Sequence, residues 1–150
     1  MIRKALLKDA KLMQRLINNY SDDKVMLPRS LGYIYETIRE FNVFVDDDNN
    51  LLGCIASHIV WDDLAEIKAL AVSKQHLKKG IGKSLVEKAI LDAKLLGAKR
   101  IFALTYVNKF FEKLGFKVIN RNSLPQKIWT ECINCPKFPE CDEIAVEKYI

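Results

Sequence analysis

Several features that would place a protein in a special class are missing from this sequence of 150 residues. It contains no run of about 18 consecutive apolar residues, which a membrane-spanning helix would need. Its first residues mix charges with apolar side chains and lack the apolar stretch and small-residue cleavage site of a secretory signal. We therefore expect a cytoplasmic protein with no membrane partner.

The sequence also lacks internal repeats, low-complexity tracts and any segment that resembles a linker between domains. Its length is usual for one domain, and its 49% hydrophobic residues suffice for one packed core. We therefore predict a single domain over residues 1–150, with a cysteine-containing segment at residues 130–142. The sequence does not fix the oligomeric state, and a homodimer is compatible with it.

Signs of nucleic-acid binding are weak. The formal net charge of +5 suits an anionic ligand but does not identify one. The basic residues form no long block, and no finger spacing with two cysteines and two histidines occurs. We expect no nucleic-acid partner.

The hydrophobic periodicity predicts both helices and strands. Apolar residues recur at helical spacing after Asp9, and Ser30 is a suitable N-cap for a second helix. The apolar positions are Leu12, Met13, Leu16 and Ile17 in the first helix, and Leu31, Ile34, Tyr35 and Ile38 in the second. Strand-like segments are 2–5, 42–46, 51–60, 66–73, 100–104, 116–119 and 143–149. We expect an α/β (α+β) fold whose sheet is antiparallel in its first half.

Residues 80–96 form the clearest predicted helix, with Gly97 as a good C-terminal cap and a further short helix at 108–114. One apolar stripe of this helix consists of Ile81, Leu85, Val86, Ala89, Ile90, Ala93 and Leu96. The loop before it contains Gly80 and Gly82, which let the backbone approach a ligand closely. Free N–H groups and the dipole of the first helical turn favour an anion. The positive charge of Lys78, Lys79 and Lys83 points to a pyrophosphate.

Two well-known glycine motifs do not fit this loop. A P-loop would require a glycine where Leu77 stands, and the dinucleotide fingerprint would require one where Leu85 stands. An ordinary turn before a surface helix remains the alternative for the loop taken alone.

The surrounding sequence resembles the GCN5-related N-acetyltransferase (GNAT) family. The resemblance rests on Glu66-Ile67-Lys68-Ala69-Leu70-Ala71-Val72, on Lys79-Gly80-Ile81-Gly82 and on the segment 108–116. It implies a mixed, mostly antiparallel central sheet with helices on both faces and acetyl-CoA as cosubstrate. The implied cofactor-binding residues are Leu70, Ala71, Val72, Lys78, Lys79, Gly80, Ile81, Gly82 and Lys83.

A narrower likeness connects the chain with the acetyltransferase domain of N-acetylglutamate synthases. It rests on Leu27-Pro28-Arg29-Ser30, on the Glu66 strand and on Ser123-Leu124-Pro125-Gln126-Lys127. The substrate that this likeness implies is L-glutamate, in arginine biosynthesis. Two carboxylates require cations, so Arg29 is the first candidate for substrate binding, Lys127 the second and Lys68 the weakest.

Glu66 is the candidate base, because the amine must lose a proton before it attacks. A glutamate in this strand has that role in the resembling synthases. Thr105 and Tyr106 follow a buried strand and are candidates for orienting the thiol or the intermediate. Many family members have a tyrosine where this chain has Phe111, so their general acid is not carried over. We interpret Cys54 as a small buried hydrophobic residue.

Three cysteines, Cys132, Cys135 and Cys141, lie close together near the end of the sequence. In a cytosolic chain they indicate either zinc or iron–sulfur ligands or reduced thiols in a loop. We expect a metal there to hold the tail in place.

Two other functional hypotheses stay open. An enzyme of the same fold could take another small amine or a protein N-terminus as acceptor. A non-catalytic module could bind CoA or metal without turnover.

Overall fold

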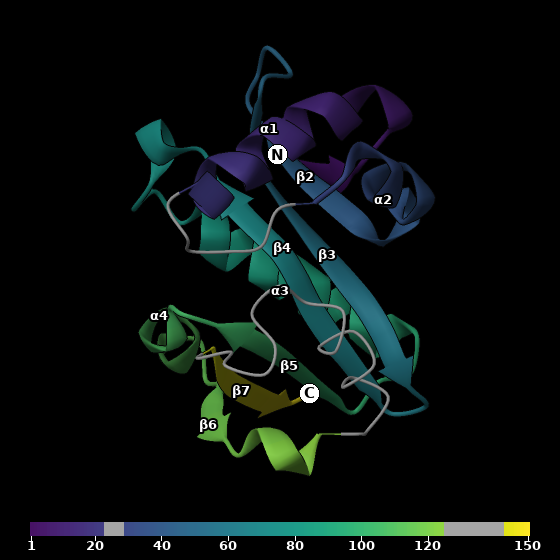
Figure 1. Ribbon diagram of the computed structural model, residues 1–150, viewed down its shortest axis with the longest axis vertical. Helices are drawn as coiled ribbons and strands as arrows, with labels where there is room; N and C mark the ends of the chain where they lie inside the picture. Colours follow the sequence, from purple (N-terminus) through teal and green to yellow (C-terminus); the bar gives the residue numbers. More distant parts are fainter. Residues whose placement is uncertain (23–28, 125–142) are drawn as a thin grey trace.

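The computed structural model describes residues 1–22, 29–124 and 143–150 (Figure 1). Its strands are β1 (Ile2–Lys4), β2 (Phe41–Val45), β3 (Leu51–Trp61), β4 (Leu64–Val72), β5 (Arg100–Thr105), β6 (Lys117–Ile119) and β7 (Ile144–Tyr149). Its α-helices are α1 (Ala10–Asp22), α2 (Leu31–Glu36), α3 (Ile81–Leu95) and α4 (Asn108–Lys113). Short 3-10 turns are η1 (Leu7–Asp9), η2 (Ile38–Glu40), η3 (Lys74–His76) and η4 (Arg121–Ser123).

The described strands form one sheet in the order β1-β2-β3-β4-β5-β7-β6. Neighbouring strands are antiparallel except for β4 and β5, which are parallel. A crossover is needed between parallel strands, and α3 provides it. The prediction of a mixed, mostly antiparallel sheet is confirmed.

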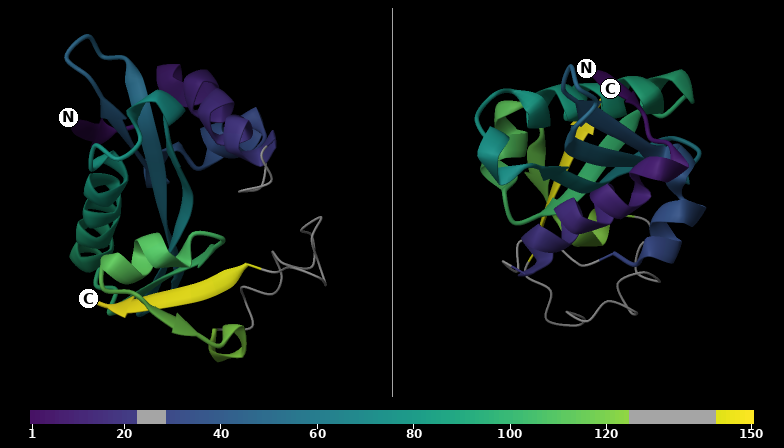
Figure 2. Two further views of the ribbon diagram at one scale, coloured as in Figure 1. Left: turned by 90° about the vertical axis from the view of Figure 1, so that its left-hand side faces the viewer. Right: turned by 90° about the horizontal axis from the view of Figure 1, so that it is seen from above.

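Helices cover both faces of the sheet. Figure 2 shows α3 and α4 on one side of the long strands and α1 and α2 on the other. Alternating side chains of the strands fill a separate core on each face. The core under α3 includes Ile55, Ile67 and Leu85. The core under α1 includes Met13, Phe41 and Cys54.

The helices follow the predicted stripes with four exceptions. Leu12 of α1 and Tyr35 of α2 are exposed, not buried. Ser30 caps α2 through its side chain, which accepts a hydrogen bond from the Tyr33 N–H, as predicted. Ile38 does not belong to this helix, because α2 ends at Glu36 and Ile38 begins the turn η2. Leu96 lies beyond the last turn of α3 and is 73% exposed, so it is not part of the buried stripe. Gly97 has a φ of 96°, as the predicted cap requires.

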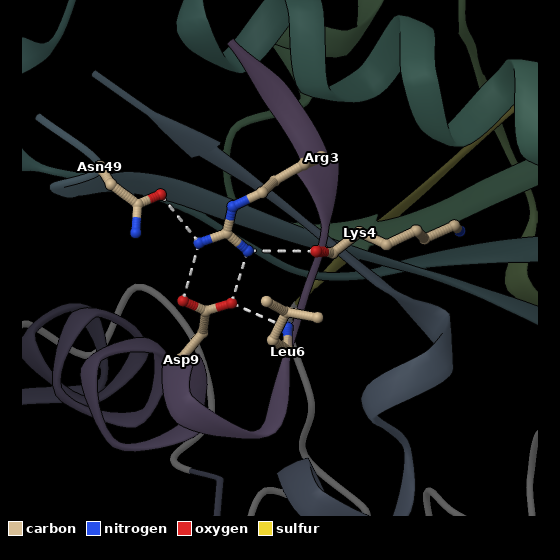
Figure 3. A network of polar contacts seen from close by, with 5 residues as sticks. All are labelled: Arg3, Lys4, Leu6, Asp9 and Asn49. Atoms are coloured by element: carbon tan, nitrogen blue, oxygen red, sulfur yellow. Dashed lines mark hydrogen bonds and ion pairs between the residues drawn. The ribbon is translucent and has the colours of Figure 1, made fainter. Parts of the chain in front are cut away.

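A polar network holds the first strand against the first helix (Figure 3). The Arg3 guanidinium donates to both carboxylate oxygens of Asp9, at 2.7 and 3.0 Å, and also to Asn49 Oδ1 at 3.2 Å. The Leu6 N–H donates to Asp9 as well. These bonds join β1, the start of α1 and the turn between β2 and β3. They fix the position of α1 over the sheet.

Among the described residues, no helix combines the length and the apolar character that crossing a membrane would take.

Candidate functional site

The parallel strands β4 and β5 remain paired only at one end. Their register runs from Leu64 opposite Arg100 to Glu66 opposite Phe102. Beyond Glu66 the two strands diverge, as Figure 1 shows. The second half of β4 therefore has one backbone edge that is not used by the sheet.

An irregularity in β4 decides which side chains point toward α1 and α2. Two residues, Ala69 and Leu70, lie opposite the single residue Ile55 of β3, and Ala69 has a φ of 53°. Such a bulge interrupts the alternation of side chains. Without the bulge, the side chains on one side of it would point to the opposite face of the sheet. The bulge therefore turns Glu66 and Lys68 away from α3 and toward the face of α1 and α2.

At the end of β4, the backbone of Val72 faces the side from which β5 has diverged. The Ser73 N–H donates to the Leu52 carbonyl, so the next pair, Gly53 and Val72, is not hydrogen-bonded between the strands. The Tyr20 hydroxyl donates a hydrogen bond to the Val72 carbonyl. This contact connects the last turn of α1 with the open edge of β4.

The loop after β4 presents an uncapped helix start. Lys78 and Gly80 have left-handed φ values of 63° and 80°, and Gly80 is the N-cap of α3. Glycine has no side chain with which to cap the helix, so the N–H groups of the first turn point outward. Lys78, Lys79 and Lys83 are exposed around it. The arrangement suits an anion.

This helix start is in contact with both β4 and α4. A Cβ atom at Gly82 would lie 3.3 Å from the Phe110 ring and 3.8 Å from a methyl group of Val72. An added side chain would therefore require the Phe110 ring to shift by a few tenths of an ångström. Since β4 ends at Val72 and α4 follows β5, the helix start lies where the two strands have separated.

Two opposite charges are buried next to each other on β4. The Lys68 Nζ is 3.9 Å from Glu66 Oε1, and the two side chains are only 5% and 9% exposed. Burying charged groups costs free energy, so a buried pair is unusual unless it has a function. The described face of the sheet therefore holds a buried carboxylate next to a buried ammonium group.

A second pair lies beside the first. His58 is directly opposite Glu66 in the antiparallel register of β3 and β4. Its Nδ1 is 2.7 Å from a carboxylate oxygen of Glu40 in η2. Ser57, the residue before it, contacts the backbone of α3, so His58 faces the opposite side together with Glu66.

Arg29 lies before α2, on the face of the sheet toward which Glu66 and His58 point. Its N–H donates to Asn18, and its guanidinium carbon is 5.0 Å from the centre of the Tyr33 ring. Its Nε is buried and has no hydrogen-bond partner among the residues that the structure describes. A buried donor without a partner costs free energy that a bound acceptor would recover. An anionic group of a ligand fits this place.

The other predicted catalytic residues are placed differently. The Thr105 hydroxyl accepts a hydrogen bond from the Val107 N–H at 2.9 Å and lies at the end of β5. Tyr106 follows it and is half-buried. Phe111 is buried against Phe110 and Phe116, with ring centres 5.2 Å apart in each pair. The structure thus places the Thr105 hydroxyl in the turn before α4 and Phe111 in the core.

Cys54 is buried, and burial raises the pKa of its thiol to about 12. It does not serve as a thiolate nucleophile. Lys127 and the three cysteines Cys132, Cys135 and Cys141 lie outside the described residues. Within the described ranges, no three side chains of the metal-binding types come together.

Sequence reasoning missed three parts of this site. The bulge had no signal, because alanine does not indicate a positive φ. The pairing of Glu40 with His58 joins residues 18 positions apart on different elements. The contact between Tyr20 and Val72 spans 52 positions. Only the helix and strand arrangement in space brings these partners together.

Residues 11–116 match the model of the acetyltransferase (GNAT) family, and the chain belongs to this family. It is an acetyl-CoA-dependent N-acetyltransferase. An uncharacterized N-acetyltransferase of Chlorobaculum tepidum is 42% identical over 98% of this chain and 94% of its own length. An amino-acid acetyltransferase of Mycobacterium tuberculosis is 31% identical over 87% of this chain and 75% of its own length.

A solved structure is similar over nearly the whole chain. It is the N-acetylglutamate synthase of Neisseria gonorrhoeae complexed with coenzyme A and N-acetyl-glutamate, with a TM-score of 0.91 and 28% identity. The similarity covers 99% of this chain and 34% of that protein.

Proposed function

We propose that this GNAT acetyltransferase transfers the acetyl group of acetyl-CoA to the α-amine of L-glutamate, in arginine biosynthesis. The observation that carries the proposal is the pair of charged features on one face of the sheet. Glu66 is buried beside the point where β4 and β5 diverge, and the Arg29 guanidinium has a buried nitrogen that finds no partner within residues 1–22, 29–124 and 143–150. The first supplies a base and the second recognises a carboxylate. The Mycobacterium and Neisseria relatives support an amino-acid acceptor.

The cofactor has its place along β4 and at the start of α3. The backbone N–H groups of Gly80, Ile81, Gly82 and Lys83 surround the pyrophosphate, and Lys78 and Lys79 add positive charge. The edge of β4 at Leu70, Ala71 and Val72 binds the pantetheine arm. The Val72 N–H, which takes no part in the pairing with β3, points toward the separated strands and can donate to the thioester carbonyl, where negative charge develops in the tetrahedral intermediate.

Glu66 takes a proton from the ammonium group of the acceptor, directly or through one water molecule. The free amine then attacks the carbonyl carbon of the thioester. The carbon–nitrogen bond forms first, giving the tetrahedral intermediate. The carbon–sulfur bond then breaks, and the leaving thiolate takes up the second proton that the nitrogen loses. Lys68 stabilises the charged form of Glu66 before the reaction. Cys54 is held as a buried thiol and offers no thiolate nucleophile, in keeping with direct transfer from acetyl-CoA to the amine.

Arg29 binds one carboxylate of glutamate through its guanidinium fork, and Lys127 binds the other. Thr105 and Tyr106, which follow β5, orient the sulfur atom or the intermediate. The leaving thiolate needs no strong acid, so the replacement of the family's tyrosine by Phe111 is compatible with turnover.

The proposal includes the remaining parts of the chain. It is one cytoplasmic domain over residues 1–150, active as a monomer or a homodimer. The segment 130–142 holds zinc or an iron–sulfur cluster through Cys132, Cys135 and Cys141. Elemental analysis of the purified protein, with Cys135→Ser as control, tests the metal. A metal-free protein with full activity would remove it from the proposal.

The experiment that tests the function is an assay of thiol release from acetyl-CoA with a panel of amines. The panel contains L-glutamate, other amino acids, a polyamine and a peptide with a free N-terminus. Release that is fastest with glutamate supports the proposal. If only another amine causes thiol release, the protein is an acetyltransferase with a different acceptor. If CoA binds but no thiol is released, the protein is a non-catalytic module.

A further inference from the structure

We propose that His58, held by Glu40, carries the proton that Glu66 receives out to the solvent. The inference rests on the proposed role of Glu66. His58 does not touch the reacting atoms and acts through Glu66, so it is a positioning and proton-relay residue.

The reaction itself requires such a path. An acceptor amine enters as an ammonium ion, and the products are an amide and the CoA thiol. The ammonium ion loses two protons, of which the leaving thiolate takes one. One proton per turnover must therefore leave the site. Glu66 has a side chain only 9% exposed, so it needs a neighbour that can pass the proton on.

The register places that neighbour beside it. His58 and Glu66 are direct cross-strand partners, and such side chains begin about 5 Å apart on the same face. The side chains of Glu66, Glu40 and His58 are 9%, 24% and 35% exposed, so the path leads from the buried carboxylate toward the surface. Lys68 is the other charged group of β4 on this face.

The Glu40 carboxylate also fixes the state of the imidazole ring. It lies 2.7 Å from Nδ1, so this nitrogen carries the hydrogen in the neutral ring. The other nitrogen, Nε2, is then an acceptor, and it has no partner in the part of the chain described by the structure. His58 and Glu66 form no direct hydrogen bond among the described residues, so Nε2 receives the proton of the Glu66 carboxyl group through an intervening water molecule. The imidazolium that forms keeps the Nδ1 hydrogen bond to Glu40. The proton then passes to water, and Glu66 is again a carboxylate.

The test measures acetyl transfer by His58→Ala in buffers of increasing concentration, with and without added imidazole. We expect kcat to fall about tenfold or more, in the range of lost acid–base assistance. We expect added imidazole to restore kcat in a saturable way, while the Kd for CoA stays unchanged. Glu40→Gln should lower kcat less. Glu36→Gln, which changes an exposed glutamate one turn earlier, is the matched control and should have no effect.

Two results would overturn the relay: wild-type kcat in His58→Ala, or a loss of kcat that imidazole does not restore although CoA binds normally. If His58→Ala fails to fold, His58→Gln decides, because glutamine can still donate to Glu40 but cannot pass a proton on. The wild-type kcat with glutamate, measured first, tests the proposed function. The ratio of the His58→Ala kcat to the wild-type kcat tests the relay, and it can be measured with whichever amine the enzyme acetylates.

Discussion

The Tyr20 hydroxyl donates a hydrogen bond to the carbonyl of Val72, which joins the end of α1 to the open edge of β4. The partners belong to the two sides of the proposed reaction. Tyr20 comes from the helix that precedes Arg29, and Val72 from the strand to which we assign the CoA arm.

Tyr20→Phe removes this hydrogen bond and leaves the ring in place. A hydrogen bond of this kind contributes about 1 kcal/mol, so we expect a comparable loss of unfolding free energy and a Kd for CoA about fivefold higher. Urea unfolding and calorimetry measure the two effects. Tyr35→Phe, at an exposed position of α2, is the control and should leave both values unchanged. If the Kd for CoA of Tyr20→Phe equals that of the Tyr35→Phe control, Tyr20 does not support the cofactor site.

Glu66→Gln keeps the shape of the side chain and removes the base. We expect kcat to fall by about 10²–10⁴, the range of general base catalysis. The affinity for CoA should change little, because Glu66 lies on the acceptor side of the bulge. Rates of thiol release and calorimetry with CoA give both numbers. An active Glu66→Gln enzyme would show that another group removes the proton.

Arg29→Ala should mainly raise the KM for glutamate. A charge-assisted hydrogen bond to a carboxylate contributes about 1.5–3 kcal/mol, which corresponds to roughly 10- to 150-fold. Initial rates at varied glutamate, with acetyl-CoA saturating, measure the change. Arg15→Ala, on the exposed side of α1, serves as the control. If both variants keep the wild-type KM, Arg29 does not bind the acceptor.

Comparing Gly80→Ala with Gly32→Ala distinguishes the effect of backbone strain from the effect of side-chain packing. At each position an added Cβ atom would meet nothing within 4 Å, but only Gly80 has a left-handed φ. We expect Gly80→Ala to lower the unfolding free energy by about 1–2 kcal/mol and to weaken CoA binding. Gly32→Ala, inside α2, should stabilise the protein by about 0.5–1 kcal/mol. A Gly80→Ala variant with unchanged CoA affinity would contradict a binding role for this loop.

Asp9→Asn tests the network that holds α1 on the sheet. The Arg3 hydrogen bonds keep the pKa of Asp9 below its usual range, although burial acts in the opposite direction. The folded protein therefore gains stability from Asp9 above the unfolded pKa of about 3.9 and loses it as the pH falls through the lower folded pKa. We expect Asp9→Asn to cost about 2 kcal/mol at pH 7. The gap to wild type should shrink below about pH 4, with exposed Asp62→Asn as the control.

The order of elements could be predicted because each one has a local cause. Ser30 starts α2, Gly97 ends α3, and the periodicities of two and of 3.6 mark the strands and helices. The cofactor loop is local too, since its glycines and lysines are adjacent in sequence. Leu96 and Ile38 were misplaced because periodicity does not show where a helix stops.

The substrate side could be predicted only in part. Arg29 and Glu66 are recognisable as charged residues beside family motifs, but the bulge at Ala69 that turns Glu66 and Lys68 to one face has no residue signal. The partnership of His58 with Glu40 depends on the register of β3 and β4 and on the position of η2. Such contacts are set by packing between elements, which spacing along the chain does not record.

The most direct test of the central claim is a competition experiment. Purified protein receives a limiting amount of isotope-labelled acetyl-CoA together with an equimolar mixture of amino acids and polyamines, and mass spectrometry identifies the labelled product. We predict that the label appears in N-acetylglutamate and that Glu66→Gln abolishes it. Label in another amine, or no labelled amide although CoA binds, would contradict the proposed function.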